Sequence, residues 1–221
     1  MKKSVYVLVF IAFALGGCSS MKIDEIKNSA QRLVLEEYFS GKTRAWGLFE
    51  DRFGTIRRQF VVDIDGKWDG TELVLNEDFT FADGEKSNRV WRIRKLANGT
   101  YEGSANDIIG VATGTVGGNA LHWRYVLDLE IAKGRTMAVQ LDDWMFLQPH
   151  GVLMNRARMS KFGIELGQIT ISFSKISEDS SNKKTAATNL QPYAADSAKA
   201  YQPSGIFYKT ATRHPNIPNS Q

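Results

Sequence analysis

The chain has 221 residues, of which 43% are hydrophobic and 11% aromatic, a composition typical of a globular protein with an apolar core. Its formal net charge of +4 arises from two lysines near the start and from a small basic excess after position 175, so residues 18–175 carry no net charge. A neutral body without a basic stripe argues against nucleic acid as a partner.

The first 17 residues have the pattern of an export signal. Lys2 and Lys3 precede an apolar run over residues 5–15, which is too short to remain as a membrane-spanning helix. The sequence Leu-Gly-Gly-Cys that ends at Cys18 resembles the lipobox of bacterial lipoproteins, where small residues precede the acylated cysteine. We therefore expect residues 1–17 to be removed and Cys18 to carry the lipid. An ordinary secretory signal, with Cys18 incidental, is the alternative.

Cys18 is also the only cysteine of the chain. It cannot form an internal disulfide, and a lone free thiol is unusual in an exported protein. Acyl chains on this residue would make the membrane a partner of the protein. Ser19 follows it and resembles the signal that sorts lipoproteins onward, so the expected location is the periplasmic face of the outer membrane.

The mature chain divides into three segments. Residues 18–32 are mostly polar and are interpreted as a tether. Residues 33–175 consist of short strand-like runs between turn signals such as Asp65-Gly66, Asp83-Gly84 and Asn98-Gly99, which predicts an all-β meander, either a barrel or a sandwich. Only residues 148–163 are ambiguous, since Val152–Met159 fits either a helical turn or a strand.

Residues 176–221 differ in composition from the rest. Ser, Asn, Thr, Ala, Lys and Gln dominate there, and four of the five prolines of the chain lie in this segment. The segment is predicted to be a disordered tail. The alternative is a peptide arm that binds a protein partner through Tyr193, Tyr201 and Phe207-Tyr208.

Alternation along each run separates a core face from a solvent face, because successive strand side chains point to opposite sides. The predicted core face includes Leu73, Leu75, Trp91, Trp123 and Phe173 in different runs. For residues 101–111, treated as one strand, it includes Tyr101, Ile109 and Val111. His122 falls on the solvent face.

Five charged residues fall on these otherwise apolar faces. They are Arg58, Glu77, Arg89, Asp107 and Asp143. Because unpaired buried charges are costly, such residues should be paired with one another or should line a cavity. One interpretation is a structural charge network, or a bulge that turns some of them to water. The other is a cavity in which Arg58 or Arg89 binds the carboxylate or phosphate of an amphipathic ligand.

Signals for catalysis, metals or cofactors are weak. The histidines are scattered without ligand spacing, and the glycine-rich segments lack the following helix that a phosphate loop requires. We therefore expect no metal and no cofactor. Adjacent Asp142 and Asp143 point to opposite faces of a strand, so only a pair formed by Asp107 and Asp143 across a barrel would offer acid–base chemistry.

An ordered series of motifs resembles a known family. It comprises Arg44-Ala-Trp-Gly, Trp68-Asp-Gly-Thr-Glu-Leu, Glu77-Asp-Phe, Arg89-Val-Trp-Arg, Tyr101-Glu-Gly-Ser-Ala-Asn-Asp, Gly118-Asn-Ala-Leu-His-Trp, Asp142-Asp-Trp-Met and Asn155-Arg-Ala-Arg-Met-Ser-Lys-Phe-Gly. This series is similar to the bacterial lipoprotein family of domain of unknown function 3833. The resemblance covers about residues 33–175 and implies a single up-and-down, lipocalin-like antiparallel β-barrel. It implies no activity, although an association with envelope lipid modification favours a lipid ligand.

The expected function is a non-enzymatic, outer-membrane-anchored lipoprotein that binds a lipid or another amphipathic small molecule in its barrel. The alternative is a structural or interaction lipoprotein with an internally paired charge network and no ligand. A third hypothesis is an enzyme acting on lipids through Asp107 and Asp143.

Overall fold

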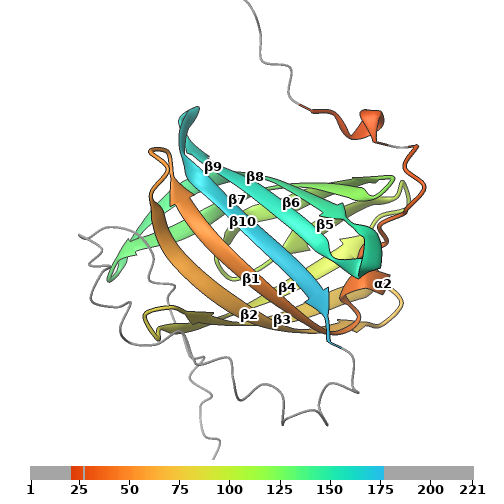
Figure 1. The fold of residues 1–221 in the computed structure, drawn as a ribbon, viewed down its shortest axis with the longest axis horizontal. Helices are drawn as coiled ribbons and strands as arrows, with labels where there is room; N and C mark the ends of the chain where they lie inside the picture. Colours follow the sequence, from red (N-terminus) through yellow and green to blue (C-terminus); the bar gives the residue numbers. More distant parts are fainter. Residues whose placement is uncertain (1–20, 27, 177–221) are drawn as a thin grey trace, which may run out of the picture.

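The computed structural model describes residues 21–26 and 28–176. The predicted signal peptide, Cys18 and residues 177–221 of the predicted tail lie outside these described residues. Ten antiparallel strands form a closed barrel in which each strand pairs with its neighbours in sequence and the last pairs with the first (Figure 1). The prediction of a single up-and-down antiparallel barrel is confirmed, and the sandwich is excluded.

Two short 3-10 helices and one short α-helix accompany the ten strands. The elements in chain order are η1 Ile23–Glu25, α2 Leu35–Phe39, β1 Gly41–Asp51, β2 Ile56–Trp68, β3 Glu72–Phe81, β4 Lys86–Lys95, β5 Thr100–Ser104, β6 Ile108–Gly117, β7 Ala120–Ala132, β8 Arg135–Leu147, η2 Pro149–Gly151, β9 Leu153–Lys161 and β10 Ile164–Lys175. The ambiguous segment 148–163 is therefore mainly a strand. Within the described residues, no helix is long and apolar enough to cross a membrane.

Aspartate side chains stabilise hairpin turns between neighbouring strands. In the β1–β2 turn, Asp51 Oδ1 accepts hydrogen bonds from the backbone amides of Phe53 and Thr55 at 2.9 and 3.0 Å. In the β2–β3 turn, the carboxylate of Asp69 accepts the backbone amides of Thr71 and Glu72 at 2.8 and 2.7 Å. Side chains of this kind replace strand hydrogen bonds with local ones and so fix the turns.

The predicted inward faces are confirmed along most strands, with one correction. Residues 101–111 form two strands separated by a turn, and the β6–β7 register shifts between Ile109 and Thr113. As a result Ile109 and Val111 are 49% and 58% exposed, whereas Ala112 is fully buried. The prediction that Ile109 and Val111 face the core was wrong, because the alternation that starts at Tyr101 ends at the turn after β5. In β6 it is Ile108 that pairs with the inward-facing Leu127.

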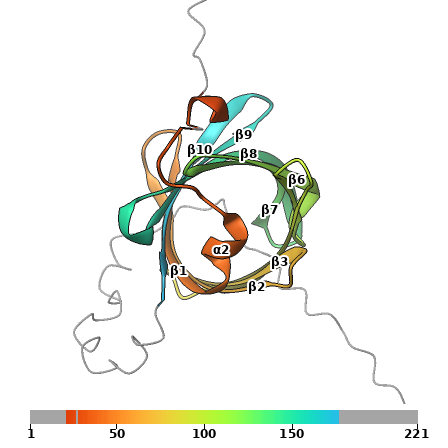
Figure 2. The same ribbon diagram turned by 90° about the vertical axis from the view of Figure 1, so that its right-hand side faces the viewer.

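Helix α2 closes one end of the barrel, a feature that the sequence pattern did not predict. In the view along the barrel, this helix lies inside the ring of strands (Figure 2). The wall leaves room for it at Gly66 of β2, where an added Cβ would lie 1.8 Å from the carbonyl oxygen of Phe39. Only a glycine permits this close approach of two backbones.

Polar contacts attach the plug, as we call helix α2, to strands β4, β5 and β10 and to η2. Glu36 accepts hydrogen bonds from Lys95 of β4 at 2.6 Å and from Tyr101 of β5 at 2.7 Å. Burial acts to raise the pKa of Glu36, but these hydrogen bonds outweigh it and the pKa lies below its usual value. On the other side, the hydroxyl of Tyr38 lies 3.0 Å from the carbonyl oxygen of Gly151 and 3.2 Å from that of Phe173.

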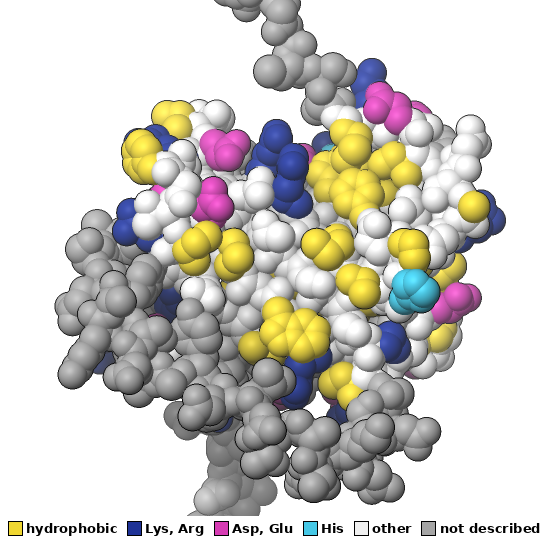
Figure 3. Space-filling view, viewed as in Figure 1, with side chains coloured by type: hydrophobic (Ala, Val, Ile, Leu, Met, Phe, Trp, Pro, Cys, Tyr) yellow, Lys and Arg dark blue, Asp and Glu magenta, His cyan; other side chains and the backbone are white. Residues whose placement is uncertain are grey.

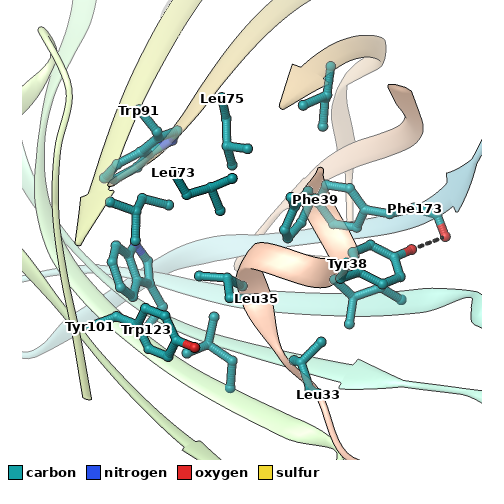
Figure 4. Close-up of a cluster of buried hydrophobic side chains, with 14 of the residues drawn as sticks. Leu33, Leu35, Tyr38, Phe39, Leu73, Leu75, Trp91, Tyr101, Trp123 and Phe173 are labelled. Atoms are coloured by element: carbon teal, nitrogen blue, oxygen red, sulfur yellow. Dashed lines mark hydrogen bonds between the residues drawn. The ribbon is translucent and has the colours of Figure 1, made fainter. Parts of the chain in front are cut away.

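The apolar core lies mainly beneath this plug. Figure 4 shows Leu35 and Phe39 facing side chains of the barrel wall, among them Leu73 and Trp123. A second buried cluster, which includes Phe49, lies in strands β1 and β7–β9. On the outer face in Figure 3, hydrophobic side chains form separate groups with charges of both signs around them.

Candidate functional site

The barrel contains a cavity of about 190 Å³. Leu35 and Phe39 of the plug line one end of it, and Arg58 and Glu130 line it near hairpins at the other end. Ten strands give a wider interior than the eight-stranded barrels that side chains can fill, which explains why space remains. Most of the wall is apolar and aromatic, as in pockets for small organic molecules.

All five charged residues predicted to face inward line this cavity. Arg89 on β4 lies opposite Glu77 on β3 in the strand register. Its guanidinium reaches Asp107, in the turn after β5, where Nε and Nη2 donate hydrogen bonds to Oδ2 at 2.9 and 2.6 Å. The contact links β4 to the turn between β5 and β6, across the short strand β5. The carboxylate of Asp107 thereby balances the positive charge of Arg89 inside the barrel.

Glu77 and Asp143 lie in the same interior but without such a guanidinium contact. Burial raises the pKa of Glu77 to about 7, despite the opposing charge of Arg89. Burial also raises the pKa of Asp143 to about 7, against the effect of a hydrogen bond from the side-chain amide of Asn155. Each carboxyl therefore changes protonation near neutral pH, which is unusual for a carboxylic acid.

Tyr125 lies among these groups, on β7. Burial raises the pKa of its hydroxyl, and the charges of Asp143, Asp107 and Glu77 act in the same direction. Its ring packs edge-on against Trp91 at 5.5 Å between ring centroids. Tyr125 therefore stays neutral and presents a hydroxyl to a carboxyl-rich interior.

Sequence reasoning assigned Tyr125 to the core and did not select Asn155 as a site residue. Asn155 is only 3% exposed and projects inward from β9 beside Asp143. Alternation alone does not assign a face to Asn155, because the sequence of residues 148–163 fits either a helical turn or a strand. Treating Leu153, Asn155, Ala157 and Met159 as alternate positions of one strand would have identified it.

Arg58 lies apart from this central group. Its guanidinium lies 3.2 Å from Glu85 and 3.8 Å from Asp83, both in the β3–β4 turn, and stacks over Phe81 at 3.9 Å from the ring centroid. Asp83 is 57% exposed, so this ion pair belongs to the mouth of the cavity, at the end opposite the plug. The sequence could not show that Arg58 lies at the mouth of the cavity, because alternation along a strand predicts whether a side chain faces inward but not how far it lies from the end of the barrel.

The remaining polar candidates have different partners. Asp107 is bound to Arg89 and Asp143 to Asn155, so these two carboxyls do not share a hydrogen bond. His122 lies on the outer face as predicted, 3.0 Å from Asp142 and stacked on Trp144. The arrangement is that of an apolar cavity with a polar centre, which can hold and orient a small molecule.

Comparisons with known proteins identify the family of the chain but no activity. No curated protein matches the chain. The family model described as "Protein of unknown function (DUF3833)" matches residues 12–175, which include the whole barrel. The chain therefore belongs to the DUF3833 family.

Proposed function

We propose that this protein is a lipid-anchored barrel of the bacterial outer membrane, facing the periplasm, that binds an amphipathic small molecule without transforming it. The observation that carries the binding function is the cavity, in which apolar walls surround a few convergent buried polar groups. Such a combination is the usual form of a small-molecule site, where the wall binds the apolar part and the polar groups set orientation.

The cavity volume limits the size of what can be bound. About 190 Å³ is below the roughly 300–1,000 Å³ of pockets for drug-sized ligands. A short acyl chain or a compact amphipathic molecule fits this space, whereas a complete phospholipid does not. The plug closes the end at Leu35 and Phe39, so the ligand enters past Arg58.

Native mass spectrometry of the full chain, extracted from membranes under mild conditions, tests the binding function. We expect the wild-type protein to carry a small co-purifying ligand. Ala157 is 2% exposed and lines the cavity, so Ala157→Phe should fill the space and abolish the adduct. Ala138→Phe is the matched control, because Ala138 is exposed on β8.

A mass equal to that of the acylated chain alone, in every wild-type preparation, would contradict the binding function and favour a structural charge network. Retention of the adduct in a folded Ala157→Phe protein would place the ligand elsewhere. If Ala157→Phe fails to fold, Ala157→Val reduces the cavity with less overpacking.

The anchor is supported by the lipobox-like sequence that ends at Cys18, which lies outside the described residues. Replacing this residue as Cys18→Ser should move the protein from the membrane to the soluble periplasmic fraction and remove the mass of the acyl chains. A Cys18→Ser protein that remains in the outer-membrane fraction would contradict this part of the proposal.

A further inference from the structure

The central part of the cavity contains more acidic than basic groups. Three carboxyls, those of Glu77, Asp107 and Asp143, line it together with a single guanidinium, that of Arg89. Arg89 is bound to Asp107 at 2.6 Å, and the hydrogen-bond partner of Asp143 is the neutral amide of Asn155. Glu77 and Asp143 are therefore left in excess over the available positive charge.

Two buried acceptors in the same region have no hydrogen-bond partner in the described part of the chain. They are Oδ1 of Asp107 and Oδ1 of Asn155, and both residues line the cavity. Asn155 is 97% buried, so bulk water does not satisfy this oxygen. Leaving a buried acceptor unpaired costs about 1–3 kcal/mol, so a ligand that donates hydrogen bonds here gains this energy back.

We propose that the polar end of the bound ligand is an ammonium group, so that the protein binds short amphipathic amines in preference to carboxylates or phosphates. This proposal rests on the binding function proposed above and specifies its ligand. An ammonium has three donors and no acceptor, which matches the unpaired oxygens of Asp107 and Asn155. Its positive charge also offsets the excess of Glu77 and Asp143.

The walls suit the rest of such a ligand. Trp91 and Tyr125 lie beside the acidic centre, and aromatic faces attract cations. Aliphatic side chains of β7 and β10, including Leu127 and Ile171, line the cavity and provide apolar surface for a short chain. An anionic end would instead lie among three carboxyls, and both arginines that line the cavity are already paired, Arg89 with Asp107 and Arg58 with Glu85.

The protonation of the carboxyls that line the cavity also favours an amine as the ligand. Burial raises the pKa values of Glu77 and Asp143 to about 7. The other charged or titratable groups that line this cavity are Arg89, Asp107 and Tyr125 in its centre, with Arg58, Asp128 and Glu130 also in its wall. A bound cation favours the ionised carboxylates, so amine binding should release protons near neutral pH. Affinity should therefore increase between about pH 6 and about pH 8, below the pKa of the amine.

Three probes of equal chain length test the proposal with the full chain freed of endogenous ligand. They are hexylamine, hexanol and hexanoate, with binding followed by calorimetry at about pH 8, where the carboxyls are ionised. We expect hexylamine to bind at least about tenfold more tightly than hexanoate, because a charge-assisted hydrogen bond replaces a repulsion. Hexanol should lie between them.

Asp143→Asn removes one negative charge with almost no change in shape, and should weaken hexylamine binding about tenfold while leaving hexanol binding unchanged. Asp142→Asn is the matched control, because the neighbouring Asp142 is 52% exposed and contacts His122 on the outer face. Should Asp143→Asn fail to fold, Glu77→Gln makes the equivalent change on β3.

The outcomes separate this inference from the proposed function. Hexanoate binding as tightly as hexylamine would overturn the amine preference while the binding function stands. Equal hexylamine affinity in folded Asp143→Asn, Glu77→Gln and wild-type proteins would also overturn it. If none of the three probes binds, both the inference and the binding function fall.

Discussion

The protonation of Asp143 makes the stability of the barrel depend on pH in a direction opposite to that of most carboxylates. Its pKa is raised from 3.8 to about 7 by burial. The folded state therefore binds more protons than the unfolded state between these two values. Stability from this group is complete below about pH 4 and is lost as the pH rises toward about pH 7.

The size of this effect follows from the shift. Each pKa unit corresponds to about 1.4 kcal/mol, so a shift of this size represents a loss on the order of 4 kcal/mol between acid and alkaline conditions. The side chain is only 5% exposed, so solvent screens it little. Asp143→Asn keeps an acceptor for the amide of Asn155 but cannot ionise. We expect this variant to be more stable than wild type at about pH 8, by a few kcal/mol, and nearly equal below about pH 4.

Urea unfolding of wild-type, Asp143→Asn and Asp142→Asn proteins across this pH range measures the effect. The free energy of unfolding of wild type and Asp142→Asn should fall as pH rises. That of Asp143→Asn should fall by a smaller amount, because Glu77 still titrates in this variant but Asp143 does not. A constant difference between the Asp143→Asn and wild-type curves from acid to alkaline pH would show that Asp143 does not titrate in this range, and the argument from burial would be refuted.

Three further predictions concern the plug, the ion pair and the core. Gly66→Ala places a methyl group against the carbonyl oxygen of Phe39, so it should destabilise the barrel by about 1–3 kcal/mol. It should also accelerate amide hydrogen exchange in residues 35–40, and unchanged exchange would contradict this close contact. Arg89→Ala should cost about 3–5 kcal/mol in denaturant unfolding, because Asp107 is left charged and unpaired, and adding Asp107→Asn should recover part of the loss. Leu73→Ala, at a side chain 1% exposed, should cost about 2–5 kcal/mol in thermal or urea unfolding, and a loss below this range would mean that the core collapses around the missing atoms.

The anchor prediction and the cavity predictions depend on different parts of the chain. The predicted acylation of Cys18 would depend on a local sequence that a peptidase recognises in an extended chain, so no tertiary structure is needed to predict it. The proposed ligand selectivity would depend on the spatial convergence of strands β3, β4, β7 and β8 with the turn after β5. Loss of one property should therefore leave the other intact.

Strand periodicity was sufficient to predict which residues face the interior over most of the barrel. Glu77, Arg89 and Asp143 were identified in this way, because alternation relates sequence position directly to one face of a strand. The rule failed at Ile109 and Val111, because the turn between β5 and β6 interrupts the alternation that starts at Tyr101. Which residues of the second strand face inward is set by its register with the neighbouring strand, and a single sequence does not reveal that register.

Local order along the chain was enough to predict the class of fold and the inward position of the charges, and it is also the basis of the prediction that Cys18 carries a lipid. The tertiary structure decided which charges are partners. In the folded barrel, Arg89 binds Asp107, and Asp143 binds Asn155. Arg58 lies apart from them at the mouth, paired with Glu85. The five-residue helix α2 packs inside the barrel against Gly66, where the absence of a side chain leaves room for Phe39. These relations depend on strand register and barrel closure, which bring residues distant in sequence into contact and which no local pattern specifies.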